Sequence, residues 1–142
     1  MEFKIINQQS GAHSSYSNDV IASFLEVHLD RFGDKKEDIL KCLAYVFNKG
    51  GFITLGIEND EIIGAVVINE TGMNGYIPEN ILVYIAVHEN QRGKGMGSQL
   101  MKKAIENAKG SIALHVEADN PAKKLYERLG FTNKYLEMRL QK

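Results

Sequence analysis

The sequence predicts an α+β fold, a single domain of mixed α/β structure in which helices cover both faces of one central sheet. The chain has 142 residues, 44% of them hydrophobic, which suffices for one core and leaves no room for a second domain. Short β-rich runs alternate with longer helical runs along the chain. Near the end of the chain single strands alternate with single helices, which predicts a parallel strand pair in a mixed, mostly antiparallel sheet.

The first half of the chain is expected to contain one strand, two helices and a hairpin. Apolar residues recur at helical spacing in two segments, and the two β-rich runs that follow are joined by turn residues. These elements are a strand at Phe3–Ile6, helices at Val20–Phe32 and Lys36–Asn48, and a hairpin of FITLGIEND and EIIGAVVIN that turns at Asn59 and Asp60. The next segment, ETGMNGYIPEN, contains two glycines and a proline and is expected to be an exposed connection.

The second half is expected to alternate strands with helices. The elements in order are a strand at Ile81–Val87, a glycine-rich turn, a helix to Lys109, a strand SIALHVE, a helix NPAKKLYERL and a closing strand KYLEMRL. Glycine follows each of the two helices, as is common where a helix ends. In the second helix Asn120 is expected at the N-cap and Pro121 at the first helical position.

The composition argues against several classes of function. Lys and Arg total 17 against 18 Asp and Glu, so the net charge of -1 provides no general attraction to nucleic acid or to an anionic membrane. The single cysteine excludes an intrachain disulfide, and the four histidines lack metal-ligand spacing, so no metal is expected. The first residues lack the pattern of a signal peptide, and no segment approaches the ~18 apolar residues of a membrane span. A cytoplasmic protein is expected.

The stretch QRGKGMGSQLMKKAIENA places a basic, glycine-rich turn directly before a helix. The turn contains Arg92, Gly93, Lys94, Gly95 and Gly97. A helix start leaves about four N–H groups without partners and carries roughly half a positive charge. Glycines let the backbone close on a phosphate, and the two basic side chains add charge at the rim. The turn therefore has the features of a phosphate-binding loop, the alternative being a structural turn with solvated basic residues.

Two familiar phosphate-binding loops do not fit the spacing. A dinucleotide-binding G-x-G-x-x-G pattern would need glycine at Leu100 or at Ser98. A Walker loop would need glycine at His88, five residues before the Gly93–Lys94 pair. What remains is Arg-x-x-Gly-x-Gly after a strand that ends in IAV.

Two segments stand in a fixed order with one strand between them. The first, ILVYIAVHENQRGKGMGSQLM, resembles motif A of the GNAT superfamily of acyl-CoA-dependent N-acetyltransferases, and the second, NPAKKLYERLGF, resembles motif B. Together they cover Ile81–Phe131, and the earlier residues match the family in the order of their elements. The resemblance implies one N-acetyltransferase domain at residues 1–142, with an acceptor-side half at 1–80 and an acetyl-CoA-binding half at 81–142.

The resemblance also implies a position for acetyl-CoA. The family binds it where two parallel strands splay apart, here ILVYIAV and SIALHVE. By similarity, Ile85, Ala86 and Val87 would offer backbone groups to the pantetheine. The pyrophosphate would lie at Arg92, Gly93, Lys94, Gly95, Met96, Gly97 and Ser98. Asn120 and Tyr126 would also contact the cofactor, although Asn120 stands six residues before Tyr126 where many relatives have seven.

Catalytic roles follow from the same resemblance. The N–H of Ile85 would donate to the thioester oxygen, a contact worth about 3 to 4 kcal/mol in a transition state. Tyr126 would protonate the departing thiolate; a half-buried core tyrosine is the alternative. Ile81 stands where the family often has an acid, so Glu79 is the candidate base, with a solvated loop carboxylate as the alternative. His115 is either a base that titrates near neutrality or a hydrogen-bonded structural histidine.

The expected activity is transfer of an acetyl group from acetyl-CoA to a primary amine, by direct attack through a tetrahedral intermediate. The acceptor would be a small-molecule or peptide amine, and neither nucleic acid nor membrane is an expected partner. Small members of the family are often homodimers. Two alternatives stay open: a catalytically silent CoA-binding module, favoured by Ile81 at the acid position, and a nucleotide-binding or nucleic-acid-binding domain.

Overall fold

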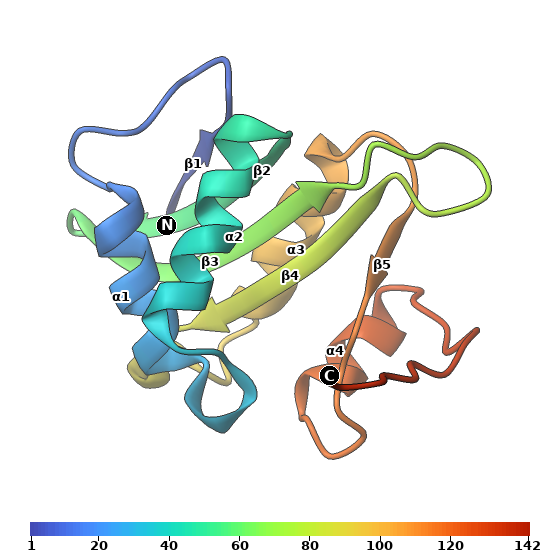
Figure 1. The fold of residues 1–142 in the computed structure, drawn as a ribbon. Coiled ribbons are helices and arrows are strands. Elements are labelled where there is room, and N and C mark those ends of the chain that lie inside the picture. The colour runs from blue at the N-terminus through green and yellow to red at the C-terminus, as the bar shows by residue number, and fades with distance from the viewer.

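A five-stranded sheet lies at the centre of the structure, a computed structural model that describes residues 1–142 (Figure 1). Its strands are β1 (Glu2–Ile6), β2 (Gly51–Glu58), β3 (Glu61–Glu70), β4 (Asn80–Val87) and β5 (Ile112–Leu114). The helices are α1 (Asn18–His28), α2 (Lys36–Asn48), α3 (Met96–Asn107) and α4 (Ala122–Arg128), with 3-10 turns η1 (Asp30–Phe32) and η2 (Glu89–Gln91). None of these helices combines the length and the hydropathy that crossing a bilayer requires.

The strands lie in the sheet in the order in which they occur in the sequence. Neighbours are antiparallel from β1 to β4, whereas β4 and β5 are parallel, which confirms the predicted mixed sheet. The predicted β2–β3 hairpin is also confirmed. It turns at Asn59 and Asp60, whose φ angles of 52° and 64° lie in the left-handed region that a two-residue type I′ turn requires.

Helices cover both faces of the sheet, as predicted (Figure 1). On one face α1 and α2 bury apolar side chains such as Ile21 and Leu43, which are 0% exposed. On the other face α3 buries Leu100 and Met101, and α4 adds Tyr126 to the same apolar cluster. The sheet therefore separates two apolar clusters, and the side chains of β4 are divided between them.

The two helices of the first half differ in how well local spacing predicted them. The bounds of α2, Lys36–Asn48, are those predicted. The helix predicted over Val20–Phe32 ends at His28 instead, because Asp30 has a φ of 54°, which an α-helix cannot contain. The 3-10 turn η1 carries the chain on to Phe32.

The end of the chain corrects two predictions. The closing strand expected at KYLEMRL does not form, and Tyr135, Leu136, Met138 and Leu140 are 78% to 91% exposed. The strand expected at SIALHVE is reduced to the three residues of β5. A strand exists only where a neighbouring strand accepts and donates hydrogen bonds along its edge. The alternating apolar residues of these two segments predicted strands. They do not indicate which edge of the sheet each strand would pair with.

Candidate active site

The two parallel strands pair only at their beginning. β4 and β5 are in register over Asn80–Leu82 and Ile112–Leu114. Directly after Leu82 the register between β3 and β4 shifts, because Val83 has no opposite residue on β3. A β-bulge of this kind bends its strand and increases its twist. The second half of β4 consequently turns away from β5, and the strands diverge toward their carboxyl ends (Figure 1).

The diverging half of β4 directs backbone groups into the gap between the two strands. The N–H of His88 donates to the Ile63 O atom at 2.8 Å, so this residue faces β3. In an antiparallel ladder the direction alternates along the strand, so Ala86 also faces β3. Ile85 and Val87 therefore face the gap, where no residue of β5 pairs with them. These backbone groups are available to a ligand between the strands.

The turn between β4 and α3 has an open surface at its glycines. Gly93 and Gly95 have φ angles of 78° and 76°, and no atom lies within 4 Å of where a Cβ would stand on either residue. The first backbone bond of α3 runs from the Gln99 N atom to the Gly95 O atom at 3.2 Å. The N–H groups of Met96–Ser98 thus lack intrahelical partners, and together with the helix dipole they suit an anion.

Arg92 and Lys94, the two basic residues of the turn, make different contacts. The Arg92 Nε atom donates to the Val87 O atom at 3.2 Å, and its Nη2 atom donates to the His28 O atom at 2.7 Å. The Lys94 Nζ atom reaches only the Gln91 Oε1 atom, at 3.5 Å. Arg92 is therefore held against the end of α1, whereas Lys94 remains at the exposed rim of the turn.

Tyr126 lies on the α3 side of the sheet, in the apolar cluster to which Ile85 and Val87 also belong. The side chain is 7% exposed, and no protein group hydrogen-bonds to its hydroxyl. Burial, followed by the negative charge of Glu117, raises the pKa of Tyr126 to about 12. The phenol is therefore protonated at every physiological pH and has a proton to donate.

Asn120 precedes α4, as predicted, but the regular helix begins one residue later than expected, at Ala122. The Asn120 Oδ1 atom accepts a hydrogen bond from the Ala122 N atom at 2.9 Å. Its side chain thus satisfies one of the free N–H groups at the helix start.

Glu79 lies at the opposite end of β4 from the gap. Its carboxylate accepts hydrogen bonds from the Gly75 N atom at 2.9 Å and from the Ser111 N atom at 2.7 Å, and these bonds hold its pKa below the usual range. Six residues of extended strand separate it from Ile85, a distance of about 20 Å. The prediction that Glu79 is the base finds no support in this geometry.

His115 follows β5 and is exposed, and no hydrogen bond to its side chain is present in the structure. The hydrogen-bonded structural histidine considered from the sequence is therefore not observed. No group of three or more His, Cys, Asp and Glu side chains is arranged to hold a metal ion.

The connection between α1 and α2 reaches the site through contacts that the sequence does not predict. The Arg31 Nη2 atom lies 2.9 Å from the Asp119 Oδ2 atom, beyond β5. The Tyr84 hydroxyl of β4 donates to the Asp34 Oδ2 atom at 2.6 Å. The connection therefore touches both sides of the gap. No local signal indicates these pairs, because 88 and 50 positions separate the partners in sequence.

Comparison with known protein families identifies a family to which this geometry can be related. A family model described as acetyltransferase (GNAT) domain matches residues 49–133. This range includes the gap between the parallel strands, the glycine turn and Tyr126, and it covers more than half of the chain.

Individual proteins agree with this match. The chain is similar to N-alpha-acetyltransferase 30 of Schizosaccharomyces pombe, with 31% identity over 85 residues, which are 56% of this chain and 57% of that protein. The matched part thus spans little more than half the length of that curated relative. Among solved structures, a putative acetyl transferase from Pyrococcus furiosus is 25% identical, with a TM-score of 0.64 and 99% of each chain covered. A probable acetyltransferase has the same fold, with a TM-score of 0.73 at 19% identity, covering 100% of this chain and 99% of that one.

Proposed function

The chain belongs to the GNAT acetyltransferase family, and from this premise we propose that it is an N-acetyltransferase that moves the acetyl group of acetyl-CoA to a primary amine. One observation carries the proposal: the gap between β4 and β5 opens next to the glycine turn. Acetyl-CoA contains both a thioester, which would lie in the gap, and a pyrophosphate, which would lie at the turn. The short stretch from Val87 to Met96 joins the two features.

The chemistry of the gap and the turn fits acetyl-CoA. Backbone groups of Ile85 and Val87 are directed at the position of the pantetheine, whose amides both donate and accept hydrogen bonds. The free N–H groups of Met96–Ser98 suit the pyrophosphate, with Lys94 at the rim. Contacts from Ala86 and Asn120 stay predictions, because the first faces β3 and the second is bonded to α4.

In the proposed reaction the amine attacks the thioester carbon directly. The N–H of Ile85 donates to the oxygen that becomes an oxyanion in the tetrahedral intermediate, which a well-placed donor stabilises by about 3 to 4 kcal/mol. When the C–S bond breaks, Tyr126 gives its proton to the thiolate sulfur. The attacking nitrogen loses one proton to solvent and Tyr126 regains one from solvent, so the products are the acetylated amine and CoA with a free thiol.

The acceptor side is proposed to be the half at residues 1–80, entered beside the connection between α1 and α2. Asp34 is exposed there and has no cationic partner, and the phenol of Tyr84 orients its carboxylate. An unpaired carboxylate at the edge of the gap attracts an acceptor that is a cation in solution. A small-molecule or peptide amine has this property.

The amine must lose a proton before it attacks the thioester. At a pKa near 10, only about 0.1% of a free amine is neutral at pH 7. Glu79 remains the base that the sequence predicts, and its two backbone hydrogen bonds give it a structural role in addition. Glu79→Gln removes the base and one of the two acceptor oxygens, so the free energy of unfolding is measured beside kcat. A loss of kcat in a variant that stays folded would indicate the base.

Two measurements test the proposal. Calorimetry of the folded chain with acetyl-CoA is expected to show saturable binding, and a screen of amines is expected to release free CoA with at least one of them. Absence of binding heat with both acetyl-CoA and CoA would contradict the proposed cofactor site. Binding without any CoA release across a broad panel of amines and peptides would instead assign the second candidate, a silent CoA-binding module, which the position of Glu79 favours.

A further inference from the structure

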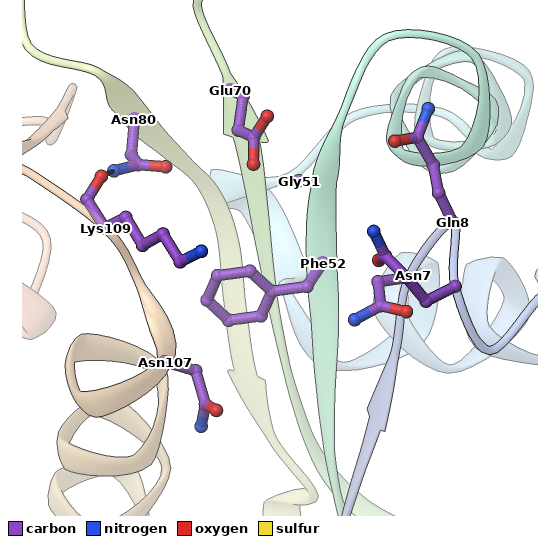
Figure 2. Close-up of a pocket in the computed structure, with 9 residues that line it drawn as sticks. Asn7, Gln8, Gly51, Phe52, Glu70, Asn80, Asn107 and Lys109 are labelled. Carbon is purple, nitrogen blue, oxygen red and sulfur yellow. Dashed lines mark hydrogen bonds between the residues drawn. The ribbon is translucent and has the colours of Figure 1, made fainter.

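We propose that the protein has a second ligand site, a polar pocket that binds a small zwitterion of the α-amino-acid type. The pocket has a volume of about 340 Å³, within the range of about 300–1,000 Å³ typical of small-molecule sites. Its lining is mostly polar and includes Asn7, Gln9, Phe52, Glu70, Asn80 and Lys109 (Figure 2). It combines carboxamides with one carboxylate and one ammonium group, so the formal charge of the lining is zero.

The pocket lies away from the proposed acetyl-transfer site. Asn80 begins β4 and Glu70 ends β3, whereas the acetyl group is proposed to lie at Ile85. Five residues of strand separate Asn80 from Ile85, a distance of about 16 Å. A molecule in this pocket cannot attack a thioester at that distance. The ligand is therefore distinct from the amine acceptor.

Two side chains of opposite charge line the pocket without forming an ion pair with each other. The carboxylate of Glu70 and the ammonium group of Lys109 both point into it (Figure 2). Neither takes part in any of the ion pairs of the structure. A ligand that carries one positive and one negative group matches both, and charge-assisted hydrogen bonds are the stronger kind.

Asn80 adds an acceptor that no protein group uses. Its residue is 2% exposed, and its Nδ2 atom donates to the Lys109 O atom at 2.7 Å and to the Ser111 O atom at 3.3 Å. None of the hydrogen bonds of the structure reaches its Oδ1 atom, which points toward the pocket in Figure 2. This oxygen is open to the pocket and can accept a hydrogen bond from a ligand ammonium placed between Asn80 and Glu70.

The opposite wall offers donors for a carboxylate. The Asn7 Oδ1 atom accepts a hydrogen bond from the Ser10 N atom at 2.9 Å, which leaves the Nδ2 group free to donate. With Lys109 it can hold the negative end of the ligand. The ring of Phe52, which is 7% exposed, lies between these polar groups and gives the carbon skeleton an apolar contact (Figure 2).

The test is a calorimetric titration of the full chain with a panel of free α-amino acids, in the absence of acetyl-CoA. At least one amino acid is expected to bind saturably, and its N-acetylated and carboxamide forms, which each lack one charge, are expected to bind at least about tenfold more weakly. Glu70→Gln and Lys109→Met are expected to weaken binding by a similar factor. Glu37→Gln and Lys102→Met, at exposed positions outside the pocket, serve as matched controls and are expected to leave it unchanged.

Chemical-shift changes locate the bound amino acid independently. The side-chain amide of Asn80 and the ring of Phe52 are expected to shift on titration. The proposal is overturned by absence of saturable binding up to about 10 mM, by equal affinity in the Glu70 and Lys109 variants, or by shifts confined to Ile85–Met96. None of these results bears on acetyl transfer, which is measured separately.

Discussion

The Arg92 Nη1 atom lies 3.1 Å from the Asp30 Oδ2 atom and joins the turn after β4 to the connection between α1 and α2, 62 positions apart in sequence. Because the same guanidinium also donates to the His28 O and Val87 O atoms, it holds the end of α1 against the start of the turn. Arg92 thus has a bracing role, meaning that it holds α1 and the turn together, at a position where the sequence predicts a contact to the cofactor.

Asp30→Asn separates these two roles of Arg92. The variant loses the ion pair but keeps the positive charge at the turn. Since the two side chains are 45% and 55% exposed, the pair is worth about 0.2–1 kcal/mol in the free energy of unfolding. We expect a stability loss within that range and no rise in the KM for acetyl-CoA. Arg92→Gln should raise that KM about tenfold; an unchanged KM would leave Arg92 with the bracing role alone.

Tyr126→Phe should reduce kcat by about 10²- to 10⁴-fold, the usual contribution of a general acid. The hydroxyl makes no hydrogen bond within the protein, so the free energy of unfolding should change by less than about 0.5 kcal/mol. Steady-state kinetics with an identified acceptor, together with urea denaturation, measure the two effects. Because the pKa of Tyr126 is raised to about 12, its deprotonation should not limit kcat below that pH. A variant with full kcat would show that Tyr126 is a core residue only.

Tyr84→Phe removes the hydroxyl that donates to Asp34 at 2.6 Å. Hydrogen bonds to charged groups contribute about 1.5–3 kcal/mol, and the exposure of Asp34 reduces this to about 1 kcal/mol here. A double-mutant cycle of Tyr84→Phe and Asp34→Ala should give a coupling energy of that size in urea denaturation. Strictly additive effects would contradict the interaction. Asp34→Asn should raise the KM for a cationic acceptor and leave the KM for acetyl-CoA unchanged.

Gly51→Ala should destabilise the sheet strongly. Gly51 has a φ of 128°, and a Cβ there would stand 2.1 Å from the Ile68 O atom of β3. Gly72→Ala is a matched control, because its φ of 79° is also positive but nothing lies within 4 Å of its Cβ position. The control should lose only about 1–2 kcal/mol, the conformational cost of the left-handed region. Thermal denaturation should show a clearly larger loss for Gly51→Ala, and equal losses would contradict the steric argument.

The pair of His28 and His88, whose ring centroids are 4.3 Å apart, should make stability depend on pH. Burial, followed by the charge of His88, lowers the pKa of His28, with a further lowering by Arg92 and opposing effects of Glu89 and Asp30. Below the unfolded value of about 6.5 the unfolded chain therefore binds more protons than the folded one. Stability should fall as the pH drops through about 6.5 toward the lower folded pKa.

His28→Gln tests this pH dependence. The variant should lose less stability than the natural chain between about pH 7.5 and 5.5, as measured by urea denaturation at each pH. His115→Gln, at an exposed position, should keep the original dependence. Identical pH profiles for His28→Gln and the natural chain would rule out His28 as the cause.

Features that depend on neighbouring residues were predictable from the sequence. The bounds of α2 follow from apolar spacing, and the hairpin follows from turn residues that tolerate the left-handed region at Asn59 and Asp60. The start of α3 follows from the glycine turn, whose Gly93 and Gly95 adopt positive φ. In each case the physical cause lies within a few residues, so the local sequence contains it.

The sequence by itself thus determined the fold class, the family resemblance and the position of the glycine turn. Only the tertiary structure decided that a bulge at Val83 opens the gap, that the connection before α2 touches both of its sides, and that KYLEMRL forms no strand. These features depend on which residue of another element lies opposite a given position. Turn chemistry and amphipathic spacing act over one or two turns of chain, whereas register and side-chain contacts form between segments 50 or more positions apart.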